Sequence, residues 1–113
     1  MSNQENRIVN ILKDFDSWSV TRYTVKAFFT YINNNTSLPC EVINMEQGDG
    51  EKYLITEIED LGDTMYGLTC KVKPVSNKRR RLVFALVELE ATDIKSKNYE
   101  ILDDYSVWFS NSQ

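Results

Sequence analysis

The stretch CEVINMEQGDGEKYLITEIEDL, residues 40–61, decides the fold class, because its apolar side chains recur at about every second position. This period is typical of a β-strand. The intervening segment 45–52 has two glycines around an aspartate, which is typical of a hairpin turn. The stretch therefore predicts two antiparallel strands, beginning at Cys40 and Tyr53 and joined by a tight turn.

Two further strands are predicted downstream. The third runs from Met65 to Pro74, and the fourth covers RLVFALVELEA, residues 81–91, which is the most apolar segment of the chain. Turns at 62–63 and 75–78 separate them. Short strands at nearly regular spacing predict a curled antiparallel sheet that resembles a small SH3-like barrel.

Helices are predicted on both sides of these strands. Residues 5–15 have apolar side chains at helical spacing, and a second helix is expected from Val20 to about Ile32, after a cap at Asp16–Ser17 or Ser19. A third helix covers NYEILDDYSVWFSN, residues 98–111. Its expected packing face consists of Tyr99, Leu102, Tyr105, Trp108 and Phe109. The predicted class is α+β, in a single domain over residues 1–113.

Composition narrows the classes of function. The chain has 113 residues and 42% hydrophobic content, and it lacks an apolar run of roughly 18 residues, so we expect a folded, cytoplasmic protein without a membrane span. It has no histidine, which excludes Ser-His-Asp and Cys-His catalysis. Cys40 and Cys70 are expected to be small buried residues. Binding is therefore favoured over enzymatic catalysis.

The net charge of −4 is distributed in blocks. Between Glu41 and Asp63 the acidic side chains greatly outnumber the single basic one, Lys52. The segment 71–81 has only basic charges, and acidic residues dominate again afterwards. Such blocks are complementary faces of one fold or separate ligand surfaces, and their order in the sequence does not distinguish the two.

Carboxylates in three places are candidate ligands for an oxygen-preferring cation such as Ca²⁺. They follow the second predicted strand in EIEDLGD, lie on one face of the fourth strand, and gather on one side of the last helix. The candidates are Glu57, Glu59, Asp60, Asp63, Glu90, Glu100, Asp103 and Asp104. The competing interpretation of each cluster is a solvated acidic surface.

The segment GDGE, residues 48–51, resembles part of an EF-hand loop. An EF-hand needs oxygen ligands at loop positions 1, 3 and 5, glycine at 6 and glutamate at 12, between two helices. Predicted strands flank this segment instead. We therefore interpret it as the tip of a hairpin.

The run Lys78, Arg79, Arg80 and Arg81 lies at the end of another predicted hairpin. Arginine binds phosphates and carboxylates through paired N–H groups, so this run is the alternative candidate site, for a protein partner or an anionic nucleotide. The function would then be that of an inhibitor, immunity factor or adaptor. Extended nucleic acid is disfavoured because the chain is acidic overall.

Several short motifs resemble the small, non-EF-hand calcium-binding proteins grouped with cyanobacterial CcbP. They are Phe29 and Tyr31, Leu38-Pro39, Leu89-Glu90, Asn98-Tyr99, and Asp104-Tyr105 with Trp108. They occur in the same order over about residues 28–111. The resemblance implies Ca²⁺ binding through surface carboxylates, in a protein that buffers or sequesters the ion.

The chain departs from that pattern at two places. Cys40 occupies the position after the proline where the pattern has an aromatic residue, and the run 78–81 puts positive charge beside the sheet. A fold does not fix its ligand, so a partner-binding protein stays the alternative. The two hypotheses differ in whether the acidic clusters or the basic run holds the ligand.

Overall fold

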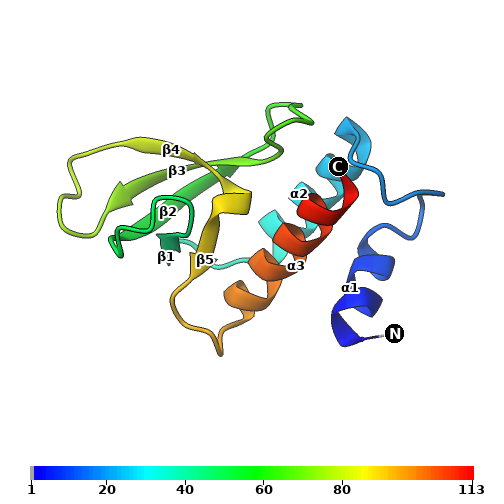
Figure 1. Ribbon diagram of the computed structural model, residues 1–113, viewed down its shortest axis with the longest axis horizontal. Coiled ribbons are helices and arrows are strands. Elements are labelled where there is room, and N and C mark those ends of the chain that lie inside the picture. Colours follow the sequence, from blue (N-terminus) through cyan, green and yellow to red (C-terminus); the bar gives the residue numbers. More distant parts are fainter. Residues whose placement is uncertain (1) are drawn as a thin grey trace.

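The computed structural model describes residues 2–113 and confirms the α+β class (Figure 1). A five-stranded antiparallel sheet curls into a half-barrel on one side, and three helices lie together on the other. The helices are α1 (Asn3–Ile11), α2 (Arg22–Asn35) and α3 (Lys97–Ser112). The strands are β1 (Cys40–Asn44), β2 (Lys52–Glu59), β3 (Thr69–Pro74), β4 (Leu82–Ala85) and β5 (Leu89–Ala91).

The predicted strand over 81–91 is wrong in one respect, because it is two strands at opposite edges of the sheet. The sheet order is β4-β3-β2-β1-β5, and the 3-10 turn η1 (Leu86–Glu88) carries the chain from one edge to the other. β5 then pairs with β1 through Val42 and Ala91. The curl of the sheet brings the two edges near enough for so short a connection.

The helix boundaries differ from the prediction at the capping residues. α2 begins after Thr21, and not after Ser17 or Ser19, because Thr21 and Thr24 form a reciprocal capping box. The hydroxyl of Thr21 accepts from the N–H of Thr24, and the hydroxyl of Thr24 accepts from the N–H of Thr21. α1 is shorter than predicted and ends at Ile11, although Phe15 still packs against the core.

An aromatic cluster joins α2 to α3. Phe28 stacks on Trp108 with ring centroids 4.5 Å apart and meets Tyr105 edge-on at 5.7 Å. The predicted packing face of α3 is therefore confirmed. The Tyr105 hydroxyl accepts a hydrogen bond from the backbone N–H of Leu68, at 2.9 Å, which fixes α3 to the chain before β3.

Both cysteines are free and buried, as expected. Burial raises the pKa of the Cys70 thiol from 9.0 to about 12. A thiol that stays protonated is a poor nucleophile. Within residues 2–113, no helix combines the length and the apolar character needed to cross a membrane.

Candidate functional site

The two glutamates of β2 already have a cationic partner. Lys71, on the neighbouring strand β3, lies 3.2 Å from Glu57 and 3.9 Å from Glu59. The hydrogen bond and the charge of Glu57 raise the pKa of Lys71. The lysine ammonium therefore occupies the position that a metal ion would need between these carboxylates.

The carboxylates after β2 shape the loop that follows. Asp60 accepts from the N–H of Gly62 at 3.0 Å, and Asp63 accepts from the N–H groups of Met65 and Tyr66 at 2.7 and 3.1 Å. In each aspartate one carboxylate oxygen accepts hydrogen bonds from nearby backbone N–H groups. The two side chains do not form a shared site.

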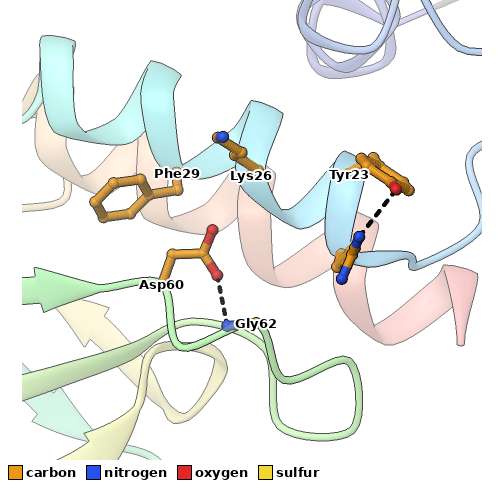
Figure 2. A pocket seen from close by; sticks show the side chains of 6 residues that line it. Tyr23, Lys26, Phe29, Asp60 and Gly62 are labelled. Atoms are coloured by element: carbon orange, nitrogen blue, oxygen red, sulfur yellow. Dashed lines mark hydrogen bonds between the residues drawn. The ribbon is translucent and has the colours of Figure 1, made fainter.

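Asp60 also faces the basic residues of α2 (Figure 2). It lines a surface hollow of about 520 Å³ with Lys26 and Phe29, and with Arg22, which donates to the Tyr23 hydroxyl at 3.1 Å. Two cationic side chains at this hollow oppose the binding of a metal cation.

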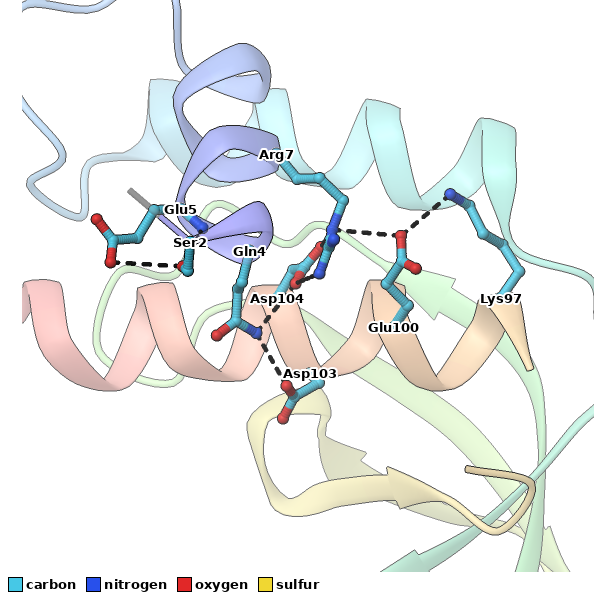
Figure 3. A network of polar contacts seen from close by, with 8 residues as sticks. All are labelled: Ser2, Gln4, Glu5, Arg7, Lys97, Glu100, Asp103 and Asp104. Carbon is cyan, nitrogen blue, oxygen red and sulfur yellow. Dashed lines mark hydrogen bonds and ion pairs between the residues drawn. The ribbon is translucent and has the colours of Figure 1, made fainter. Parts of the chain in front are cut away.

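The prediction that Asp104 belongs to an exposed acidic surface of α3 is wrong. The residue has no exposed area, and both of its oxygens accept from Arg7, at 2.7 Å from Nε and 3.0 Å from Nη2 (Figure 3). The hydrogen bond to Asp104 is the main cause that raises the pKa of Arg7. Sequence reasoning missed this pair because its members are 97 positions apart.

The neighbouring carboxylates take part in the same network (Figure 3). Glu100 lies 3.2 Å from both Arg7 and Lys97. Asp103 is exposed and accepts from Gln4 at 2.9 Å. The three carboxylates of α3 are thus held by α1 and by one lysine, and they do not converge on an open position.

Glu90 and Asp103 both lie near Tyr99. The charge of Glu90 is the main cause that raises the pKa of Tyr99, followed by desolvation and by Asp103. The three residues line a small hollow between β5 and α3 together with Ser106. Among the eight predicted carboxylates, Glu90 and Asp103 come from two separate elements and line the same hollow.

A second group of oxygens lies in the β1–β2 turn, which sequence reasoning interpreted as a hairpin tip alone. The hydroxyl oxygen of the buried Tyr53 lies 3.2 Å from Gln47 Oε1, 3.3 Å from Glu51 Oε2 and 3.5 Å from Asp49 Oδ2. Desolvation, and then the charges of Asp49 and Glu51, raise the pKa of Tyr53. We call Gln47, Asp49, Glu51 and Tyr53 the turn cluster.

The local sequence explains why these oxygens meet. Gln47, Asp49 and Glu51 alternate with Gly48 and Gly50, whose φ angles are +62° and +70°. The left-handed glycines curl the turn so that alternate side chains point inward over Tyr53. Oxygen-bearing residues at every second position, separated by glycines, are the signal that could have identified the cluster.

Across the described chain, residues 2–113, no three Cys, Asp or Glu side chains stand close enough together to form a ready-made metal site. The turn cluster has two carboxylates and one amide oxygen, and the β5–α3 hollow has two carboxylates. Any cation at either place would therefore keep several water ligands.

The basic run is exposed. Lys78, Arg79, Arg80 and Arg81 lie in the β3–β4 connection, and within residues 2–113 none of them forms an ion pair with an acidic side chain. Lys78 also lines a hollow of about 400 Å³ on the outer face of the sheet. The structure thus leaves the four charges available to a ligand.

Comparison with known proteins supports the fold alone. No protein-family model matches the chain, and neither does any curated protein sequence. A solved structure described as a calcium-binding protein in the calcium-binding form is similar to it, with a TM-score of 0.70 over 98% of this chain and 97% of the other. The two sequences are 15% identical, so the chain shares the fold of that calcium-binding protein across nearly the whole length of both.

Proposed function

We propose that this protein binds Ca²⁺ through carboxylates, without enzymatic activity, and buffers or sequesters the ion. The observation that carries the proposal is the shared fold with a calcium-binding protein, which extends over nearly all of both chains. The predominance of acidic residues and the absence of histidine agree with a ligand set made of oxygen atoms, which Ca²⁺ prefers.

The turn cluster is the part of the surface that we assign to the ion. Asp49 and Glu51 have no lysine or arginine partner within the described residues, in contrast to Glu57, Glu100 and Asp104. A hydroxyl has one proton to donate, so the Tyr53 O–H satisfies one of the three oxygens around it. A cation above the hydroxyl would neutralise both carboxylates at once.

Three side-chain oxygens are few for Ca²⁺, which takes six to eight oxygen ligands at about 2.3–2.6 Å. Water would supply the remaining ligands, and the three side chains would turn toward the ion. We therefore expect weak binding, with a Kd on the order of 10⁻⁴ to 10⁻³ M. A site in this range fills only where the free Ca²⁺ concentration itself reaches about 10⁻⁴ M or more.

The pair Glu90 and Asp103 is assigned as a second, weaker position. Its carboxylates come from β5 and α3, and both line the small hollow beside Tyr99. Asp104 is not part of the proposed site because Arg7 occupies both of its oxygens. Glu57 and Glu59 are left out because Lys71 lies between them.

Calorimetric titration of the metal-free protein with CaCl₂ at near-physiological salt tests the proposal, with MgCl₂ as the control ion. Saturable heat with Ca²⁺ that Mg²⁺ does not reproduce is the expected result. Mg²⁺ holds its waters more tightly and requires a stricter octahedral geometry than the turn offers. No heat with either ion into the millimolar range would contradict calcium binding.

A pair of double variants tests the location. Asp49→Asn with Glu51→Gln removes both charges of the turn cluster while keeping the shape of the side chains, and we expect Ca²⁺ affinity to fall on the order of tenfold. Glu57→Gln with Glu59→Gln removes the same charge from the sheet and serves as the matched control. An equal loss in the control would place binding outside the turn.

A further inference from the structure

Strand β4 forms one edge of the sheet. It pairs with β3 on one side, and its other side has no strand partner within residues 2–113. In Figure 1 it runs along the upper margin of the sheet, and the 75–81 loop before it forms the left end of the molecule. An edge strand carries a row of unpaired backbone groups that another extended chain can use.

The hydrogen-bond pattern identifies the backbone groups that point outward. The N–H of Leu86 donates to the carbonyl oxygen of Leu68 at 2.9 Å. Because hydrogen-bonded pairs alternate along an antiparallel ladder, the backbone N–H and C=O groups of Phe84 and Leu82 also face β3. The carbonyl oxygen of Lys71, the residue opposite Val83, accepts a hydrogen bond from the Thr56 hydroxyl of β2 and so points away from β4. The N–H and C=O groups of Val83 and Ala85 therefore face away from the sheet.

The two faces of β4 differ in chemistry. Leu82 and Phe84 point to the inner face, where they pack against the core but remain partly exposed. Val83 lies on the outer face with 62% of its area exposed, directly across from Lys71. A strand added at this edge would meet Leu82 and Phe84 on its inner face, and on its outer face Val83 beside Lys71, which Glu57 already pairs.

The basic run leads directly into β4. Arg81 immediately precedes the strand, and Arg79 and Arg80 come before it. These arginines are exposed and have no acidic partner in the described part of the chain. An exposed edge and unpaired positive charge thus lie at the same place.

We propose that the β4 edge and the basic run 79–81 form a docking site for an extended acidic segment of a partner protein. The segment adds a sixth strand to the sheet beside β4. Because side chains of a strand alternate between faces, the apolar residues of the segment cover Leu82 and Phe84, and its acidic residues at the end that extends past Leu82 meet the arginines.

The edge geometry favours a peptide over other anions and over a second copy of this chain. A nucleic acid has no backbone amides to pair with Val83 and Ala85, and the acidic remainder of the surface repels a long polyanion. A second copy would bring another basic run to an edge that lacks acidic residues, and the like charges would oppose that pairing.

The test uses a labelled synthetic peptide of alternating Glu and Val, and a control peptide of the same composition in which the alternation is broken. Fluorescence anisotropy measures binding to the full chain, and hydrogen exchange measures protection of individual amides. We expect tighter binding of the alternating peptide, on the order of tenfold. We also expect the amides of Val83 and Ala85 to become protected on binding.

Two variants separate the electrostatic and backbone contributions. Each exposed ion pair contributes little alone, so the first variant combines Arg79→Ser, Arg80→Ser and Arg81→Ser. We expect it to weaken binding on the order of tenfold. The matched control, Lys13→Ser, Arg22→Ser and Lys26→Ser, removes the same charge elsewhere and should change affinity by less than about twofold. Val83→Pro removes one outward N–H, which an edge strand tolerates, and should weaken binding about fivefold or more.

Several results would overturn the proposal. Equal binding of both peptides, or binding that Val83→Pro leaves unchanged, would mean attraction by charge without strand pairing. A single-stranded oligonucleotide that binds more tightly than the peptide would assign the basic run to nucleic acid. A dimer in sedimentation experiments that Val83→Pro dissociates would assign the edge to a second copy. No peptide binding at millimolar concentration would remove the site altogether.

Discussion

Arg7 binds Asp104 through two parallel hydrogen bonds, at 2.7 and 3.0 Å, and so joins the first helix to the last. Gln4, one turn earlier on α1, donates to the same carboxylate at 3.0 Å. Asp104 is fully buried, whereas the Arg7 side chain keeps 31% of its area exposed. A carboxylate that sequence analysis assigned to metal binding therefore has a structural role.

Replacing Asp104 with Asn should destabilise the fold by about 2–4 kcal/mol, because the buried site would lose its negative charge and the amide NH₂ would face the donors of Arg7 and Gln4. Urea denaturation at pH 7 measures the change. Asp103→Asn is the control, since this exposed neighbour should shift stability by no more than about 0.5 kcal/mol. Similar losses in both variants would contradict the role of the Arg7 pair.

Gly67 is the glycine at which α3 comes closest. A Cβ at this position would collide with the Tyr105 hydroxyl and with the Phe109 ring, and the φ angle is +71°. Gly67→Ala should therefore cost about 3 kcal/mol or more. Gly48→Ala has a similar φ of +62° but open space around it, and should cost about 1 kcal/mol in the same thermal or urea unfolding assay. Equal costs would show that backbone strain alone, and not the contact with α3, constrains Gly67.

Alkaline pH should destabilise the protein because its buried thiol and phenol groups resist losing their protons. Burial raises the pKa of Cys70 from 9.0 to about 12, and it also raises the pKa values of Tyr53 and Tyr105 above 10.0. The unfolded chain loses these protons first as pH rises, so the stability they contribute is complete below about pH 9 and declines above it. Cys70→Ala should show a smaller loss of stability between about pH 9 and pH 11, measured by urea denaturation. If Cys70→Ala lost as much stability over this pH range as the unchanged protein, Cys70 would not contribute to the effect.

The periodicity of the sequence predicts the three helices and the first three strands, but not the ends of the elements or the division of 81–91 into two strands. The apolar spacing around Phe28 and around Tyr105 identified two helices that do form the core. The start of α2 was missed because several short polar residues compete to cap it, and Ser17 and Ser19 hydrogen-bond to each other instead. The uniform apolar character of 81–91 concealed the break at η1, since period alone does not encode the curl of a sheet.

The candidate site depends on relationships that residue order does not reveal. Lys71 neutralises Glu57 because β2 and β3 pair in that register, and Arg7 removes Asp104 from the surface across nearly the entire chain. The turn cluster is local, but its glycines were interpreted only as turn formers. Residue type predicts a ligand set of oxygen atoms, whereas the fold determines which carboxylates already have a basic partner.

The measurement that tests calcium binding most directly is an amide NMR titration of the ¹⁵N-labelled protein with CaCl₂. The account predicts progressive, saturable shifts of the amides around the turn cluster, at Gln47, Gly48, Asp49 and Glu51, with smaller shifts near Glu90 and Asp103. The same titration with MgCl₂ should leave the turn amides nearly unchanged. Absence of shifts into the millimolar range of Ca²⁺, or shifts confined to Glu57 and Glu59, would contradict it.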